Sequence, residues 1–167
     1  GGTIFNSANI VDSSSTIERA PDSVAGIAAR VLPSVVSINT RNSSGRGGTG
    51  SGFVFDSNGY ILTNNHVIAG VANGNGAIRV TLNNGDIYSA TIIGRDASYD
   101  LAIIKISGTN LPALEFGDSD KIAVGDSVIA IGSPLGLSGT VTLGIISAKD
   151  RPVTAGDSGS GSSFINA

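Results

Sequence analysis

The sequence has 167 residues, enough for one domain of ordinary size or two small ones. It contains no cysteine and one histidine, which excludes disulfide scaffolds, thiolate zinc sites, a cysteine nucleophile and any site that needs several imidazoles. The net charge of −3, with charges scattered along the chain, argues against nucleic-acid binding, which usually needs a basic face.

The first 21 residues are polar and serine-rich, end at Pro21, and are interpreted as an N-terminal arm or linker. Asp22 or Ser23 can then cap a short helix whose apolar residues share one face, and Pro33 ends it. Beyond this helix the pattern changes to short strands. The predicted strands are 34–40, 51–56, 60–63, 77–82, 86–93, 101–106, 127–131, 139–148 and 162–166.

Composition and turn signals agree with an all-β fold. Isoleucine (20) and valine (13) outnumber leucine (9), which favours strands over helices. Asn58-Gly59 and Asn84-Gly85 are typical of two-residue hairpin turns of type I′. Short strands at spacings of about 8–12 residues predict a sandwich or a barrel.

An acidic, turn-rich segment at residues 115–120 interrupts the strand pattern. We therefore predict an arm over 1–21, a first β-barrel over 22–115 and a second domain over 116–167.

Residues 45–50 read Gly-Arg-Gly-Gly-Thr-Gly and match the glycine pattern of dinucleotide-binding loops. In such sites the pattern opens a helix, whose N-terminus receives the pyrophosphate. Here it leads into the predicted strand 51–56. We interpret it as a flexible glycine loop and expect no phosphate binding of that kind.

The single histidine, His66, lies in the sequence TNNHVI, and a lone histidine near a strand end is commonly structural. The surrounding sequence changes this interpretation. GSGFVFDSNGYILTNNHVI (50–68), DLAIIKI (100–106) and AIGSPLGL (130–137), followed by TVTLGIISA (140–148), closely resemble the HtrA/Deg family of serine proteases. The three motifs occur in the family's order, and the resemblance runs from about Val24 to Ala167.

The resemblance implies an all-β, chymotrypsin-like double β-barrel after a short N-terminal helix, with the first barrel complete and the second only partly present. It also implies that His66 is the general base and that Asp100 orients it. The chemistry agrees, because imidazole can take a proton from a weak nucleophile near neutral pH and return it to a leaving amine. A carboxylate on the other ring nitrogen fixes the tautomer. The separation of 34 residues allows the two to lie on separate strands.

The nucleophile is where the sequence departs from the family, whose Gly-Asn-Ser-Gly-Gly segment is absent. Residues 156–160 read Gly-Asp-Ser-Gly-Ser, but Ser158 has no flanking strand to hold an oxyanion hole rigid, so we interpret it as part of a surface loop. Residues 162–167 resemble the strand before the family's nucleophile loop, which puts the expected serine about a dozen residues beyond Ala167. We therefore expect the N-terminal part of a longer protease, inactive on its own.

The resemblance implies hydrolysis of peptide bonds in unfolded or damaged proteins, without metal or organic cofactor. It implies the remaining C-terminal part of the protease as a partner and allows a homotrimer. It also implies an extracytoplasmic location (periplasmic, cell-wall-facing or secreted), with or without a membrane tether on a preceding segment.

A different class of function is also open at this point. A non-catalytic pseudoprotease or chaperone-like module would grip exposed strands by edge pairing. The missing nucleophile favours this alternative, and the presence of both His66 and Asp100 disfavours it. A structural β-domain of a surface protein would leave the three motifs unexplained.

Overall fold

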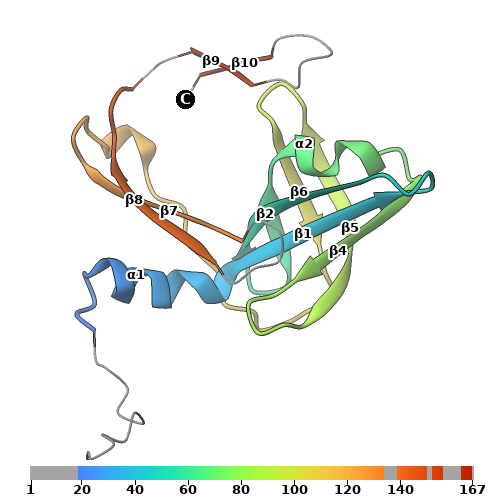
Figure 1. Ribbon diagram of the computed structural model, residues 1–167, viewed down its shortest axis with the longest axis horizontal. Coiled ribbons are helices and arrows are strands. Elements are labelled where there is room, and N and C mark those ends of the chain that lie inside the picture. The colour runs from blue at the N-terminus through green and yellow to red at the C-terminus, as the bar shows by residue number, and fades with distance from the viewer. Residues whose placement is uncertain (1–18, 134–138, 150–151, 156–162, 167) are drawn as a thin grey trace, which may run out of the picture.

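The computed structural model describes residues 19–133, 139–149, 152–155 and 163–166 (Figure 1). It is mostly β, which confirms the predicted all-β class. The helices are α1 (Val24–Val31) and α2 (Asn65–Ile68), with short 3-10 turns η1 (Leu32–Ser34), η2 (Ala69–Val71) and η3 (Ser119–Lys121). The strands are β1 (Val35–Asn42), β2 (Gly47–Asp56), β3 (Tyr60–Thr63), β4 (Gly76–Thr81), β5 (Ile87–Asp96), β6 (Leu101–Lys105), β7 (Ser127–Gly132), β8 (Thr140–Ile145), β9 (Pro152–Ala155) and β10 (Ser163–Asn166). Within these ranges no helix has both the length and the apolar character needed to cross a membrane.

The N-terminal helix α1 begins where the sequence predicts it. Ser23 is the N-cap, and its Oγ accepts a hydrogen bond from the Gly26 N–H at 3.0 Å. This bond satisfies one of the amides that a helix leaves unpaired in its first turn. Pro33 lies in the η1 turn that follows, because proline lacks the N–H that an α-helix interior needs. The chain then enters β1 at Val35.

Six strands close into a barrel in the order β1-β2-β3-β6-β5-β4, and β4 pairs back onto β1 (Figure 1). All six pairings are antiparallel. Closure gives every strand of the barrel two hydrogen-bonded neighbours, so this part of the fold has no open sheet edge.

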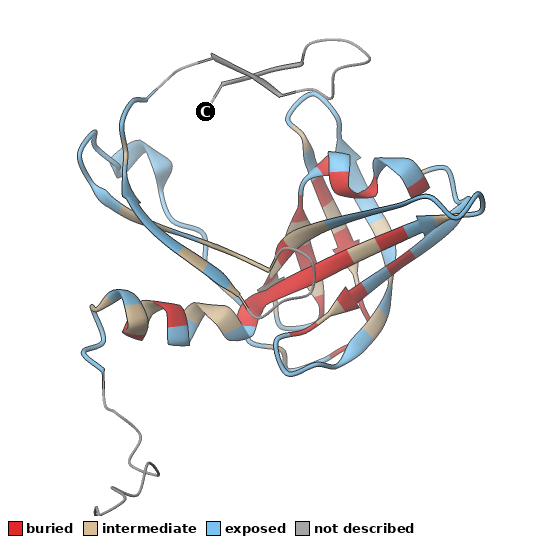
Figure 2. Cartoon of the chain, in the orientation of Figure 1, coloured by how far each residue is buried: buried red, intermediate tan, exposed pale blue. Residues whose placement is uncertain are grey.

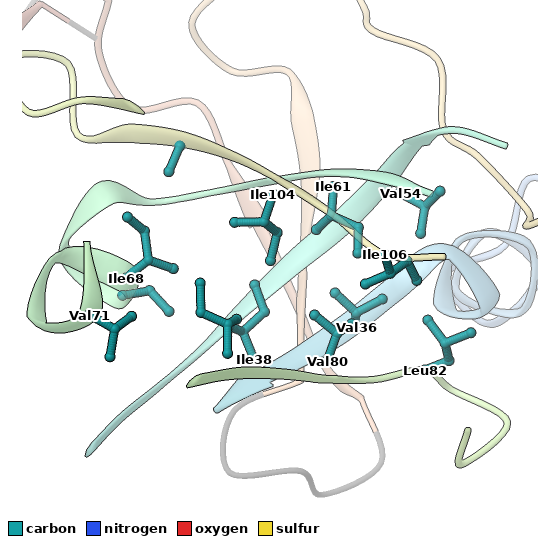
Figure 3. Close-up of a cluster of buried hydrophobic side chains, with 13 residues drawn as sticks. Val36, Ile38, Val54, Ile61, Ile68, Val71, Val80, Leu82, Ile104 and Ile106 are labelled. Atoms are coloured by element: carbon teal, nitrogen blue, oxygen red, sulfur yellow. The ribbon is translucent and has the colours of Figure 1, made fainter. Parts of the chain in front are cut away.

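The barrel interior is filled almost entirely by aliphatic side chains, most of them β-branched, which fit a pleated surface well (Figure 3). The core cluster consists of Val36, Ile38, Val54, Ile61, Val67, Ile68, Val71, Ile78, Val80, Leu82, Ala102, Ile104 and Ile106. Val67 and Ile68 come from α2, and Val71 comes from η2. This helical segment therefore packs its buried side against the barrel, as Figure 2 shows.

The two Asn-Gly hairpins form, but not with the predicted type I′ turn. Only the glycine of each pair has a positive φ, 95° at Gly59 and 92° at Gly85, whereas type I′ needs a positive φ at the asparagine too. In the second hairpin the Leu82 N–H donates to the Asp86 carbonyl oxygen at 2.9 Å. Each loop therefore contains three residues and ends on a left-handed glycine.

Residues 47–50, interpreted from sequence as a flexible loop, belong to β2. Gly50 and Gly52 have no room for a Cβ atom. A Cβ at Gly50 would lie 2.4 Å from Val67 Cγ2, and one at Gly52 would lie 2.7 Å from the Leu62 carbonyl oxygen. Glycine is needed at position 50 because α2, which carries Val67, packs directly on the β2 backbone, and at position 52 because the backbone of the neighbouring strand β3 comes close.

After β6 the chain packs back along the barrel. The Leu111 N–H donates to the Ser57 carbonyl oxygen at 3.1 Å, and the Leu114 N–H donates to the Val54 carbonyl oxygen at 2.9 Å. Phe116 then packs edge-on against a β2 aromatic ring, Phe53, with 5.9 Å between ring centroids. The boundary predicted after residue 115 falls within this segment and stays a prediction.

A second sheet follows, in which β7 and β8 pair antiparallel. It is joined to the barrel by a hydrogen bond of 2.8 Å from the Ser133 N–H to Ser51 Oγ. β9 and β10 pair as a separate antiparallel sheet. The sequence analysis missed β9, because it has only four residues and begins with Pro152, which weakens a strand pattern.

Candidate active site

His66 lies on α2, the short helix after β3, and not on a strand as the sequence analysis allowed. Asn64 has extended backbone angles, φ −82° and ψ 145°, and its carbonyl oxygen accepts from the Val67 N–H at 3.2 Å as the helix begins. Val67 and Ile68 are buried in the barrel core. The side chain of His66 faces the other way, and 71% of it is exposed.

Asp100 lies in the turn immediately before β6. Its φ is 53°, in the left-handed region that aspartate and asparagine enter more readily than other non-glycine residues. Its carbonyl oxygen accepts hydrogen bonds from Asn64 Nδ2 at 3.0 Å and from the Asn65 N–H at 3.1 Å. These bonds join the turn before β6 to the first residues of α2, 36 positions earlier in the chain.

The two residues singled out from sequence are in direct contact. His66 Nδ1 lies 2.7 Å from Asp100 Oδ2, and the His66 backbone N–H donates to Asp100 Oδ1 at 2.8 Å. An ionised carboxylate only accepts, so the ring nitrogen facing it carries the proton. Nε2 of the neutral ring is then an unprotonated acceptor on the side away from Asp100.

Burial differs sharply within this pair. Only 15% of the Asp100 side chain is exposed, against 71% for His66. The carboxylate is thus held inside the turn by hydrogen bonds on both of its oxygens, while the far edge of the imidazole is open to a reacting group. This arrangement suits a base that exchanges protons at Nε2 and keeps the proton at Nδ1.

A neighbouring arginine supports α2, and the sequence analysis missed it. Arg95 Nη1 donates to Asn65 Oδ1 at 3.2 Å, and only 9% of Asn65 is exposed. Arg95 reaches this position because it lies on β5 opposite Ala102 of β6, two residues after Asp100. No sequence signal could have found this contact, since it depends on the register of the β5–β6 pairing.

A cavity of about 350 Å³ adjoins the pair. Thr63, Asn64 and Leu101 line it from the barrel, and Ile131 of β7 lines it from the second sheet. The residues that line the cavity from the barrel are thus close in sequence to the pair: Thr63 and Asn64 precede His66, and Leu101 follows Asp100. Ser158, the serine considered from sequence, lies outside the described residues.

The described residues bring together no group of three or more His, Cys, Asp or Glu side chains of the kind that could hold a metal ion.

Comparisons with known proteins identify the family of the chain. Residues 50–166 match the family described as trypsin-like peptidase domain. The chain is 55% identical over 102 residues to a probable periplasmic serine endoprotease DegP-like of Chlamydia pneumoniae, over 61% of this chain and 20% of that relative. It is 39% identical over 154 residues to serine protease PepD of Mycobacterium tuberculosis, over 88% of this chain and 33% of that relative. Among solved structures, the HtrA-type protease AlgW with tripeptide matches with a TM-score of 0.69 and 41% identity, over 77% of this chain and 41% of that chain.

The chain spans a fifth to a third of the length of these two curated relatives. The structural similarity confirms the expected chymotrypsin-like fold, and the matched range includes both His66 and Asp100. The chain belongs to the trypsin-like peptidase domain family and, within it, to the HtrA-type serine proteases.

Proposed function

We propose that His66 and Asp100 are the general base and the orienting carboxylate of a serine endopeptidase. The observation that carries this proposal is the 2.7 Å contact between His66 Nδ1 and Asp100 Oδ2. It joins the one imidazole of the chain to a largely buried carboxylate and leaves the other ring nitrogen accessible. Three groups are needed for acyl transfer by a triad, and this contact supplies two of them.

In the first half-reaction the serine Oγ attacks the carbonyl carbon of the scissile peptide bond. Nε2 of His66 takes the Oγ proton, and the imidazolium that forms is stabilised by the negative charge of Asp100. Nε2 then gives this proton to the leaving amine nitrogen. The C–N bond breaks, and the acyl group stays on the serine as an ester.

In the second half-reaction a water molecule gives a proton to Nε2 and attacks the ester carbonyl carbon. The imidazolium returns the proton to the serine Oγ as the C–O bond breaks, and the acid product leaves. Both halves require that Nδ1 keep its proton throughout. The hydrogen bond to Asp100 Oδ2 meets this requirement.

The proposed nucleophile is a serine about a dozen residues beyond Ala167, where the resemblance to the family puts it. The relatives' names describe serine proteases, which supports a serine in this role. On this proposal the 167-residue chain has no activity by itself. Ser158 is the competing candidate, and the experiment below separates the two.

Unfolded or damaged polypeptides are the proposed substrates, and the proposed location is extracytoplasmic. One relative is named a periplasmic endoprotease, which supports a polypeptide substrate and an extracytoplasmic location. Completion of the site by the C-terminal part of the protease, and assembly as a homotrimer, belong to the same proposal.

The test is labelling of the complete protease by a fluorophosphonate probe, followed by mass spectrometry of the labelled peptide. We expect the label on a serine after Ala167 and its loss in His66→Ala, because the serine is unreactive without its base. His66 is mostly exposed, so this variant should fold normally. Tyr99→Phe is the matched control, since Tyr99 is an exposed neighbour of Asp100, and it should label like the wild type.

Three results would contradict the proposal. A label on Ser158, or hydrolysis of unfolded casein by the 167-residue chain, would move the nucleophile into this sequence. No labelling of the complete protein would instead favour the peptide-binding module.

A further inference from the structure

A second cavity, of about 440 Å³, is lined by residues of β1, β2 and β4. These three strands are neighbours in the barrel, with β1 in the middle (Figure 1). The pairing of the strands explains which residues line this cavity. Arg41 of β1 is paired with Gly47 of β2 and Ala77 of β4. Two positions earlier on β1, Asn39 is paired with Thr49 and Arg79. Residues paired across strands share one face, so all six side-chain positions line the same cavity.

Two arginines line this cavity, and its lining holds no counter-charge. Arg41 and Arg79 are diagonal across the β1–β4 pair, a relation that puts Cβ atoms about 7–8 Å apart. Both are exposed, and in the described part of the chain neither side chain has an ion pair or a hydrogen bond. Two like charges that line one cavity favour an anion between them.

The other residues around the cavity leave room for such an anion. Gly47 and Ala77, on either side of Arg41, have little or no side chain and keep the space between the guanidinium groups open. Asn39 and Thr49 add an amide and a hydroxyl, which can donate to an oxygen without adding charge. The cavity lining contains no carboxylate that could compete for the arginines.

Hydrogen bonds of Thr40 fix the backbone beneath the cavity. Thr40 Oγ1 accepts from the Gly48 N–H at 3.0 Å and lies within hydrogen-bond distance of the Val67 carbonyl oxygen, at 3.4 Å. These contacts join β1, β2 and α2 beneath the arginines. A preformed backbone reduces the conformational entropy that is lost on binding. Only the side chains of Arg41 and Arg79 then have to become ordered.

We propose that this cavity is a binding site for an oxyanion group, a carboxylate or a phosphate, held between Arg41 and Arg79. The planar guanidinium fork matches either group with two parallel N–H···O bonds. The site differs from the dinucleotide loop excluded by the sequence, because the ligand is held by side chains on strands and not by a helix N-terminus. Its lining includes neither His66 nor Asp100.

The test is a titration of the ¹⁵N-labelled full chain at constant ionic strength, once with inorganic phosphate and once with succinate. Amide shifts of Gly47, Gly48 and Thr49 should saturate with at least one of the two. Arg41→Gln and Arg79→Gln should each raise the apparent Kd about tenfold or more, because each removes one charge-assisted fork. The anion that saturates identifies the ligand chemistry as phosphate, carboxylate or both.

Arg46→Gln is the matched control. Arg46 lies on the same hairpin and is also an exposed arginine, but it does not line the cavity. Its removal should change the Kd less than about threefold, as expected for a screened, more distant charge. The proposal is overturned if neither anion gives saturable shifts, or if Arg46→Gln weakens binding as much as Arg41→Gln does. An unchanged spectrum outside the cavity verifies that the variants are folded.

Discussion

Asp100 holds His66 by two separate hydrogen bonds, one accepted by each of its carboxylate oxygens. Oδ2 lies 2.7 Å from Nδ1 of the ring, and Oδ1 accepts from the His66 backbone N–H at 2.8 Å. The same carboxylate therefore orients the imidazole and positions the backbone of α2. The Asp100 main-chain oxygen adds bonds from Asn64 and Asn65, so a single residue sets the position of the first turn.

Replacing Asp100 should separate the roles of its charge and its backbone. Asparagine tolerates the left-handed φ of 53°, whereas alanine in that region costs about 1–2 kcal/mol. We expect Asp100→Asn to keep the fold and Asp100→Ala to lower the free energy of unfolding by at least about 1 kcal/mol more than Asp100→Asn does. Urea denaturation of the two variants measures this difference. Equal stability of the two variants would show that the turn does not depend on a residue that tolerates the left-handed φ at position 100.

In the complete protease, Asp100→Asn should lower kcat by about 10⁴-fold, because the wrong ring tautomer faces the nucleophile. The fold should be unaffected, so circular dichroism and kcat are compared on the same sample. A loss of less than about tenfold would contradict the role assigned to the carboxylate.

Arg95 should keep α2 in place through Asn65. Removing the 3.2 Å hydrogen bond in Arg95→Ala leaves the largely buried Asn65 Oδ1 unpaired, which costs about 1–3 kcal/mol. Hydrogen exchange of the Asn65 and His66 amides should accelerate accordingly. Arg95→Lys, which keeps one donor, should restore part of the protection.

Arg46→Ala is the control for this experiment, since it removes an exposed arginine whose side chain makes no hydrogen bond to α2. It should leave the exchange of both amides unchanged. If Arg95→Ala also leaves them unchanged, the contact contributes nothing to the position of the helix.

Gly50 should be intolerant of any side chain because of α2. An alanine Cβ there would lie 2.4 Å from Val67 Cγ2, so Gly50→Ala must displace the helix or the strand, at a cost of about 1–3 kcal/mol. Gly94 is the matched control, because it also lies on a strand and nothing is within 4 Å of its Cβ position. Gly94→Ala should be neutral within about 0.5 kcal/mol. Equal melting temperatures for the two variants would contradict the packing of α2 on β2.

Much of the fold could be predicted from local patterns. The β3 strand was predicted with its observed ends, and β1, β4 and β6 within two residues, because their apolar residues either alternate with polar ones or form short apolar runs. The N-cap of α1 was narrowed to Asp22 or Ser23, which precede an apolar face that Pro33 ends, and the structure shows that it is Ser23. These features depend on residues that are close in sequence.

The remaining features depend on long-range packing. α2 has four residues, too few to show a helical period, and it forms because Val67 and Ile68 complete the barrel core. Residues 47–50 were interpreted as a loop, because the sequence does not show that α2 packs against this part of β2 and requires glycine there. His66 and Asp100 could be singled out from the motifs around them, but the left-handed φ of Asp100 and its contact with α2 could not.

The central claim is that Asp100 keeps the proton of His66 on Nδ1 and leaves Nε2 free to act as a base. A long-range ¹H–¹⁵N spectrum tests it directly, because the chain has one histidine and the signals need no assignment. The neutral ring of the wild type should show a protonated Nδ1 and an unprotonated Nε2. In Asp100→Asn the amide oxygen stays on the His66 backbone N–H, its NH₂ group faces Nδ1, and the proton should move to Nε2. A wild-type ring already protonated on Nε2, or a spectrum that Asp100→Asn leaves unchanged, would contradict the account.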